Sequence, residues 1–184
     1  GITDVECAKK LLHSGADKIV INSLAANDSK EICKIASEFG SQSIVISVDF
    51  LEVENEYRVF TENGKKLQTV GLQNYLTKIN TLPVGEIYLN SIDKDGTGQG
   101  FNISVLKNLP SGMSVPLILA GGAGNHNHLV EGLRYVAVDA VATANLFNFV
   151  GDGLKKARKS LLDEGFDLAE WDITIANELK SVCE

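Results

Sequence analysis

A regular alternation of two residue patterns most constrains the fold of this chain. Short runs of β-branched residues, such as residues 18–22 (KIVIN) and 43–49 (SIVISVD), alternate with stretches whose apolar residues recur every three or four positions. The first pattern is typical of strands buried on both faces, and the second predicts amphipathic helices. Strands that alternate with helices indicate an α/β fold with a parallel sheet.

Five core strands and one insertion follow from this pattern. The helix patterns fill the gaps between the strands, and no linker divides the chain, so we expect one domain over residues 1–184. Asn63-Gly64 is a strong turn signal and predicts a small antiparallel hairpin within residues 57–66. The core strands are expected at residues 18–22, 43–49, 86–90, 116–120 and 138–144.

Two helix starts have recognisable capping signals. Thr3 and Glu6 have the spacing of a capping box before the first helix. Asp28 precedes a second helix, which we expect to end at Gly40. A faint repeat between residues 15–25 and 137–147 would suit a twofold-repeated barrel, and chance explains it equally well.

The composition limits the classes of function. The chain of 184 residues is 44% hydrophobic and 22% charged, as in ordinary globular proteins, and no apolar run approaches the roughly 20 residues of a membrane helix. A net charge of -7 argues against a nucleic-acid partner. Cys7, Cys33 and Cys183 form no Cys-x-x-Cys pair, so we expect neither disulfides nor a zinc site, and a cytoplasmic location.

Small, polar and glycine residues follow each predicted strand. Ligands of parallel α/β folds collect at the carboxyl ends of strands, so these positions are candidate site residues. Glycine and small side chains let backbone N–H groups approach an anion closely. The strand ends in chain order are Asn22-Ser23, Asp49, residues 90–97 (NSIDKDGT), residues 120–124 (AGGAG) and residues 143–145 (TAN).

Two of these clusters have the composition of phosphate sites. One glycine of this kind more often only makes a strand-to-helix turn, but five successive strand ends of this composition favour ligand binding. One cluster is Asn22 with Ser23, and the other combines Gly96, Gly121, Gly122, Ala144 and Asn145.

Asp49 is the candidate for acid–base chemistry because it ends an otherwise apolar strand. Partial burial there would raise the pKa of its carboxyl group, which suits a general acid or base. The alternative is that Asp49 caps a turn or binds the hairpin backbone, and the residues leave both open. Asp93 and Asp95 have the same alternative as capping residues beside Gly96.

The histidines do not indicate a metal site. His126 and His128 are two residues apart on a predicted helix, where they would not share a face. We therefore expect surface positions for both, and we predict no metal and no organic cofactor.

Five segments together resemble one enzyme family. This family is the cyclase subunit of imidazole glycerol phosphate synthase, a (β/α)8 TIM barrel of histidine biosynthesis. The resemblance runs from Gly1 to about Phe149. The segments are GADKIVINS, FGSQSIVISVDF, YRVFTENGKK, GEIYLNSIDKDGTGQGF and LILAGGAG.

The resemblance implies an ammonia-using lyase. Its substrate would be a phosphoribulosyl aminoimidazole carboxamide nucleotide with two phosphates, and a glutaminase partner would supply the ammonia through the barrel. The products would be imidazole glycerol phosphate and an aminoimidazole carboxamide ribonucleotide (AICAR).

The resemblance also implies residue roles. Asp49 matches a catalytic aspartate, and Lys18 with Glu86 matches half of a charged ammonia gate. Asn22 and Ser23 match one phosphate site, and Asn90, Asp93 and Thr97 would line the active site. The second phosphate site matches Asp95, Gly96, Gly122, Ala144 and Asn145, beside Gly121.

Three departures keep other functions open. The family's second catalytic aspartate ends its first strand, whereas this chain resembles the barrel from after the third strand, so we expect a barrel that lacks three strands. Asn90, Ala120 and Asn145 replace the family's usual residues, and Phe101-Asn102 replaces Tyr-Asp. The alternatives are a paralogue that amidates a sugar in surface-polysaccharide synthesis and an inactive half-barrel fragment.

Overall fold

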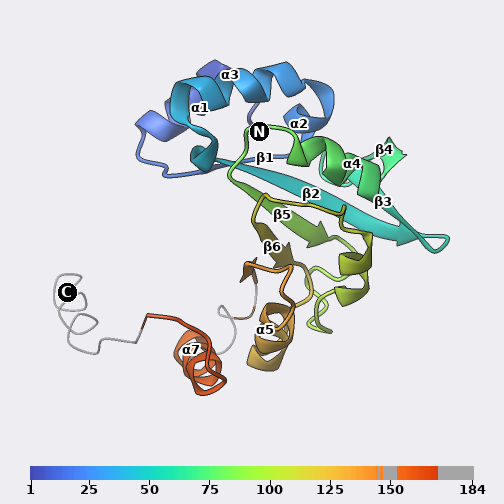
Figure 1. The fold of residues 1–184 in the computed structure, drawn as a ribbon, viewed down its shortest axis with the longest axis vertical. Helices are drawn as coiled ribbons and strands as arrows, with labels where there is room; N and C mark the ends of the chain where they lie inside the picture. The colour runs from blue at the N-terminus through green and yellow to red at the C-terminus, as the bar shows by residue number, and fades with distance from the viewer. Residues whose placement is uncertain (145, 147–152, 170–184) are drawn as a thin grey trace.

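The computed structural model of the chain describes residues 1–144, 146 and 153–169 and shows a mixed α/β fold built on one sheet (Figure 1). The strands are β1 (Ile19–Ile21), β2 (Ile44–Val53), β3 (Glu56–Thr61), β4 (Lys66–Gly71), β5 (Glu86–Ser91), β6 (Leu117–Ala120) and β7 (Ala140–Val141). The α-helices are α1 (Val5–His13), α2 (Ser23–Asn27), α3 (Ser29–Phe39), α4 (Leu72–Asn80), α5 (His126–Leu133) and α7 (Gly153–Asp163). Two 3₁₀ segments are η1 (Ser41–Ser43) and η2 (Ile103–Asn108).

The parallel part of the sheet has the order β1-β2-β5-β6-β7. Helices α1, α2 and α3 lie beside the β1 end of this sheet, and α5 and α7 lie beyond β6 at the other end (Figure 1). Strands β1 and β7 are open edges within the described residues. The prediction of an α/β fold with a parallel sheet is confirmed, and the five strands are consistent with part of a (β/α)8 barrel.

Strands β3 and β4 form the antiparallel hairpin that Asn63-Gly64 predicts. Strand β3 pairs with β2 from Asp49 to Val53, on the edge where β1 pairs with residues 44–46. Strand β2 therefore continues to Val53 instead of ending at Asp49, because β3 supplies hydrogen-bond partners beyond the end of β1.

The two faces of the sheet have different environments. One face packs under the helices, and its side chains are at most 3% exposed. The other face is only partly covered among the described residues, since Val20 is 57% exposed, whereas the residue pattern predicts burial on both faces. The difference arises because five strands do not close on themselves. The covered face carries Ile19, Ile21, Ile44, Ile46, Val48, Phe50, Ile87, Leu89, Leu117 and Leu119.

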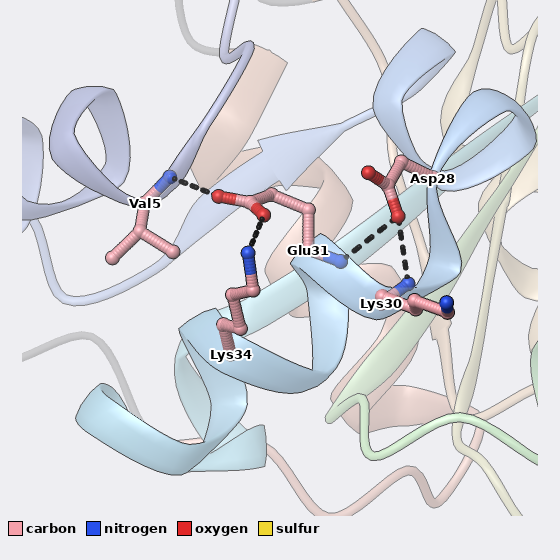
Figure 2. A network of polar contacts seen from close by, with 5 residues as sticks. All are labelled: Val5, Asp28, Lys30, Glu31 and Lys34. Atoms are coloured by element: carbon pink, nitrogen blue, oxygen red, sulfur yellow. Dashed lines mark hydrogen bonds and ion pairs between the residues drawn. The ribbon is translucent and has the colours of Figure 1, made fainter.

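The helix ends follow the capping signals with one correction. The N-cap of α1 is Asp4, whose Oδ1 accepts from the Cys7 N–H at 2.8 Å, and not Thr3. The predicted cap Asp28 is confirmed, since its Oδ1 accepts from the N–H groups of Lys30 and Glu31 (Figure 2). The C-cap of α3 is Gly40, with a φ of 84°.

Glu31 joins two helices of the same region. Its Oε1 accepts from the backbone N–H of Val5 at 3.1 Å, and its Oε2 lies 2.8 Å from the ammonium of Lys34 (Figure 2). The N–H of Val5 is in the first turn of α1 and has no partner within that helix. The contact therefore fixes the start of α1 against α3.

Several elements differ from the sequence predictions. Helix α2 was not predicted, because its five residues are too few to show a periodicity. Residues 103–108 form the 3₁₀ segment η2, and the expected strand at 138–144 pairs only over Ala140 and Val141. Among the described residues, no helix has the length and apolar character needed to cross a membrane.

Candidate active site

Parallel pairing brings the strand ends to one edge of the sheet. Asp49 on β2 is the register partner of Asn90 on β5, and Asn90 is the partner of Ala120 on β6. Asn22 follows β1 directly and serves as the backbone N-cap of α2. Residues 70 or more positions apart in the sequence thus lie in one row at the carboxyl ends of the strands.

Asp49 is the centre of a polar network in this row. Its Oδ1 accepts hydrogen bonds from Asn90 Nδ2 at 3.3 Å and from Ser47 Oγ at 3.4 Å. Its Oδ2 accepts from Asn22 Nδ2 at 3.4 Å, and the same amide donates to the backbone oxygen of Ser47 at 3.0 Å. The two asparagine side chains fix the carboxylate from both neighbouring strands.

The pKa of Asp49 lies above the usual value of an aspartate. Burial is the main cause, and the charge of Asp95 adds to it, whereas hydrogen bonds from Asn90 and Ser47 act in the opposite direction. Burial raises the pKa of a carboxyl group because the charged form loses its hydration. A rise in pKa is the direction that makes a carboxyl group a better general acid or base.

Ser23 connects this network to the hairpin. Its Oγ donates to Asn22 Oδ1 at 3.3 Å and accepts from the backbone N–H of Glu62 at 3.1 Å. Glu62 and Asn63 have positive φ values of 55° and 58°, so the turn folds back over the end of β1. A cavity of about 310 Å³ lies here. Its lining residues are Gly1, Ile2, Val20, Asn22, Ser23, Ser47, Asp49 and Asn63.

A second cavity of about 210 Å³ lies at the ends of β5, β6 and β7. It contains five residues predicted for the second phosphate site, and Asn145 lies outside the described residues. The lining residues are Tyr88, Asp95, Gly96, Gly98, Gly121, Gly122, Ala123, Gly124, Ala142, Thr143, Ala144 and Leu146.

Three glycines of this cavity, Gly121, Gly122 and Gly124, are required by close backbone contacts. A Cβ atom on Gly121 would lie 2.4 Å from the backbone oxygen of Ser91, and one on Gly122 would lie 2.2 Å from the oxygen of Gly100. Gly100 donates its N–H to the oxygen of Gly122 at 2.8 Å, which joins the two loops. At these glycines side chains are excluded, so this part of the cavity wall presents backbone atoms, while Tyr88 and Asp95 are among its other lining residues.

Asp93 and Thr97 stabilise the loop that follows β5. Asp93 Oδ1 accepts from the buried Ser91 Oγ at 2.6 Å, and Thr97 Oγ1 donates to the Lys94 oxygen at 2.6 Å. Neither residue is among those that line the two cavities described above. The contact of Asp93 within the loop agrees with its capping alternative, and a role of Asp93 and Thr97 in lining the site stays a prediction.

Lys18 and Glu86 form an ion pair at the opposite ends of the strands. Lys18 precedes β1 and Glu86 begins β5, and the register of both strands against β2 places them on the same face as Asp49. The structure therefore brings together the two residues predicted for a gate, whereas the gate function itself stays a prediction.

Tyr88 was missed by the sequence analysis. It lies two residues from Asn90 in β5, so both side chains belong to the same face of the sheet. Burial is the main cause that raises the pKa of its phenol, and the charges of Asp95 and Asp49 add to it. The alternation of Glu86, Tyr88 and Asn90 with buried residues was the signal that could have identified it.

His128 also has a role that its position in the sequence did not show. Its Nδ1 accepts from the backbone N–H of Gly124 at 3.1 Å, and its ring packs against Gly100. His126 is exposed, as expected. In the part of the chain that the structure describes, no group of three His, Cys, Asp or Glu residues could hold a metal ion.

Comparison with known proteins places this chain in a family. The family described as histidine biosynthesis protein matches residues 1–151. A protein of Parasynechococcus marenigrum, provisionally named an imidazole glycerol phosphate synthase subunit, is 41% identical over 94% of this chain and 65% of its own length. The HisF subunit of this synthase from Chlorobaculum parvum is 38% identical, and that from Chlorobium chlorochromatii is 36% identical, each over 90% of this chain and 66% of its own length.

These values limit what the comparison covers. The chain spans slightly less than two thirds of the length of these relatives. The matched region includes the Asp49 network, both cavities up to Ala144 and the Lys18–Glu86 pair. The chain therefore belongs to the histidine biosynthesis protein family, together with the HisF subunits of imidazole glycerol phosphate synthase.

Proposed function

We propose that this chain is the catalytic part of a cyclase subunit of imidazole glycerol phosphate synthase. The reaction would use ammonia to convert a phosphoribulosyl aminoimidazole carboxamide nucleotide to imidazole glycerol phosphate and AICAR. The observation that carries the proposal is the half-buried Asp49, held by Asn22 and Asn90 between two cavities, in a chain of this family.

The two cavities suit a ligand with a phosphate at each end. One cavity contains Asn22 and Ser23 on the β1 side of Asp49, and the other contains Gly96 and Gly122 on the β6 side. Asp49 itself lines the first cavity, and its register partner Asn90 lies on β5, toward the second cavity. A long substrate anchored at both ends would pass over this carboxyl group, which is the arrangement that positional catalysis needs.

Asp49 would act as the general acid or base of the cyclisation. Its raised pKa favours proton exchange, while the amides of Asn22 and Asn90 keep the carboxylate oriented. No metal or organic cofactor is part of this proposal. The protons would move between the Asp49 carboxyl group and the substrate.

A glutaminase partner would supply the ammonia. The Lys18–Glu86 pair lies at the edge of the sheet opposite to Asp49, where ammonia would enter. The names of the relatives describe subunits of a synthase, which agrees with an enzyme built from more than one chain. A cytoplasmic location, expected from the cysteines, belongs to the same proposal.

No specific observation favours either of the two alternative functions. The sugar-amidating paralogue rested on Asn90, Ala120 and Asn145, and Asn90 has a role here as a donor to Asp49 that does not depend on the substrate. The inactive half-barrel rested on the missing strands, and the open edges β1 and β7 leave that question to experiment.

The test is an ammonia-dependent cyclase assay with the natural protein, including any residues encoded beyond these 184. We expect turnover that Asp49→Asn lowers by about 10²–10⁴-fold, the usual contribution of a general acid or base. The exposed Asp163→Asn is the matched control and should keep full activity. A folded protein without turnover would reject the proposed reaction, and a fully active Asp49→Asn would remove Asp49 from it.

A further inference from the structure

We propose that Tyr88 binds the ligand directly and donates a hydrogen bond from its phenol to a hydroxyl group of a phosphorylated polyol. The phosphate of this ligand would occupy the cavity beside Gly122, and its hydroxylated chain would extend toward Asp49. The inference rests on the proposed function for the phosphate, and it adds a contact that the resemblance does not assign.

The strand register places Tyr88 in the site. Tyr88 pairs with Ser47 on β2 and Ile118 on β6, one row below the pair of Asp49 and Asn90. Two residues along a strand span about 6.7 Å, which is a distance that an extended tyrosine side chain covers. Its phenol can therefore reach the level of the Asp49 carboxyl group.

The cavity indicates where the ring lies. Tyr88 lines the same cavity as Asp95, Gly121 and Gly122. On this face Ile118 lies beside Tyr88 on β6, and the next positions toward the carboxyl ends are small, since Ala120 follows on β6 and Ala142 lies directly beyond β7. Small residues leave space next to the ring, so a ligand in this cavity would contact it.

The phenol is available as a donor. Its hydroxyl makes no hydrogen bond to another side chain or to the backbone in the described part of the chain. Burial, and then the charges of Asp95 and Asp49, raise the pKa of this phenol above its ordinary value, so it remains a protonated donor at neutral pH. The hydroxyl is not buried away from solvent, so it can donate to water in the free protein and to a bound ligand that displaces this water.

The chemistry of the surroundings favours a hydroxyl group as that acceptor. A hydroxyl oxygen can accept from Tyr88 and at the same time donate its proton to a carboxylate such as Asp49 or Asp95. A phosphate dianion has no proton to donate and would be repelled by the carboxylate of Asp49, which lies on the side away from Gly122. The polyol part of the ligand therefore fits beside Tyr88, and the phosphate fits beside the glycine backbone.

Two probes separate these contacts in the natural protein. Isothermal titration calorimetry would compare the binding of inorganic phosphate with that of ribulose 5-phosphate, a phosphorylated polyol. Tyr88→Phe removes only the hydroxyl, and Tyr135→Phe, at a position 42% exposed and outside the cavity, is the matched control.

We expect Tyr88→Phe to weaken the binding of ribulose 5-phosphate by about 3–10-fold, which is the range for one neutral hydrogen bond. The affinity for inorganic phosphate should stay within about twofold of that of the unchanged protein. Tyr135→Phe should change neither. In the unchanged protein, the ¹³Cζ resonance of Tyr88 should shift with ribulose 5-phosphate and much less with inorganic phosphate.

Unchanged binding of ribulose 5-phosphate by Tyr88→Phe would overturn the inference. An equal loss for both probes would also overturn it, because it would show a structural effect on the cavity. These outcomes differ from a failure of the proposed function, which would appear as intact binding of both probes without cyclase turnover. If the natural protein binds neither probe, the Tyr88 contact is rejected. The proposed reaction is then judged by the cyclase assay alone.

Discussion

The two halves of the candidate site are built from different parts of the chain. On the β1–β2 side, the side chains of Asn22, Ser23, Ser47 and Asp49 hold one another through hydrogen bonds. On the β5–β6 side, the backbone of a glycine-rich turn makes much of the wall, and Gly122 approaches Gly100 too closely for any side chain.

The first half supplies polar side chains for chemistry, whereas the backbone of the second half sets the shape of its cavity. Side chains in the first half can be replaced without moving the backbone, so their substitution should alter function more than stability. Glycines in the second half set the backbone path, so their substitution should alter stability and ligand binding together. The largest stability effects are therefore expected on the glycine side.

The strongest test of this comparison is Gly122→Ala. Its Cβ would lie 2.2 Å from the oxygen of Gly100, and its φ of 107° is unfavourable for alanine. We expect a loss of about 3 kcal/mol in the free energy of unfolding, from backbone strain and overpacking together. Urea denaturation of the variant measures it.

Gly112→Ala is the matched control for this change. Gly112 also has a positive φ, of 76°, but nothing lies within 4 Å of its would-be Cβ. The free energy of unfolding of this variant should fall only by the cost of a left-handed alanine, about 1–2 kcal/mol. Equal losses for the two variants would show that the contact with Gly100 has no energetic role.

An intermediate effect is expected on the side-chain half from Asn90→Leu. This change removes the amide that donates to Asp49 Oδ1 and that lowers its pKa. The pKa of Asp49 should therefore rise further above its usual value, while the fold is kept. A ¹³C NMR titration of the carboxyl group measures this, with Asp49→Asn to assign the resonance.

The pH dependence of the free energy of unfolding provides a second measurement on the Asn90→Leu variant. Because the folded-state pKa of Asp49 is raised, the folded protein binds its proton more tightly than the unfolded chain. The stabilisation that the Asp49 carboxyl group contributes is complete at pH values below its pKa in the unfolded chain. It is lost as pH rises through its pKa in the folded protein. Asn90→Leu should extend this loss to higher pH, and an unchanged profile would contradict the role of Asn90.

The smallest effect is expected far from both halves, at Glu31. Lys34 and the Val5 N–H lower the pKa of Glu31, so the contact is present above the usual carboxyl range and is lost as pH falls through the lowered pKa. Glu31→Gln should lower Tm by only about 1–2 °C at low salt, since Lys34 is solvent-exposed and the glutamine can still accept from the Val5 N–H. Scanning calorimetry with the exposed Glu131→Gln as control sets the baseline for the other variants.

Local chemistry was enough to predict much of the fold. The apolar runs identified all five parallel strands, Asn63-Gly64 identified the hairpin, and Asp28 and Gly40 identified the ends of α3. These features depend on residues within a few positions of one another. The capping box failed for the same reason, because Thr3 and Asp4 are both good caps and adjacent signals do not distinguish them.

The sequence by itself determined the α/β class and the residue types at each strand end, because strand burial and turn chemistry are local. Only the tertiary structure decided which strand ends meet. The register that pairs Asp49 with Asn90, the amide that Asn22 turns toward Asp49, and the place of Tyr88 depend on pairing between distant segments. Such pairing is set by the packing of the whole sheet, and no single stretch of the chain encodes it.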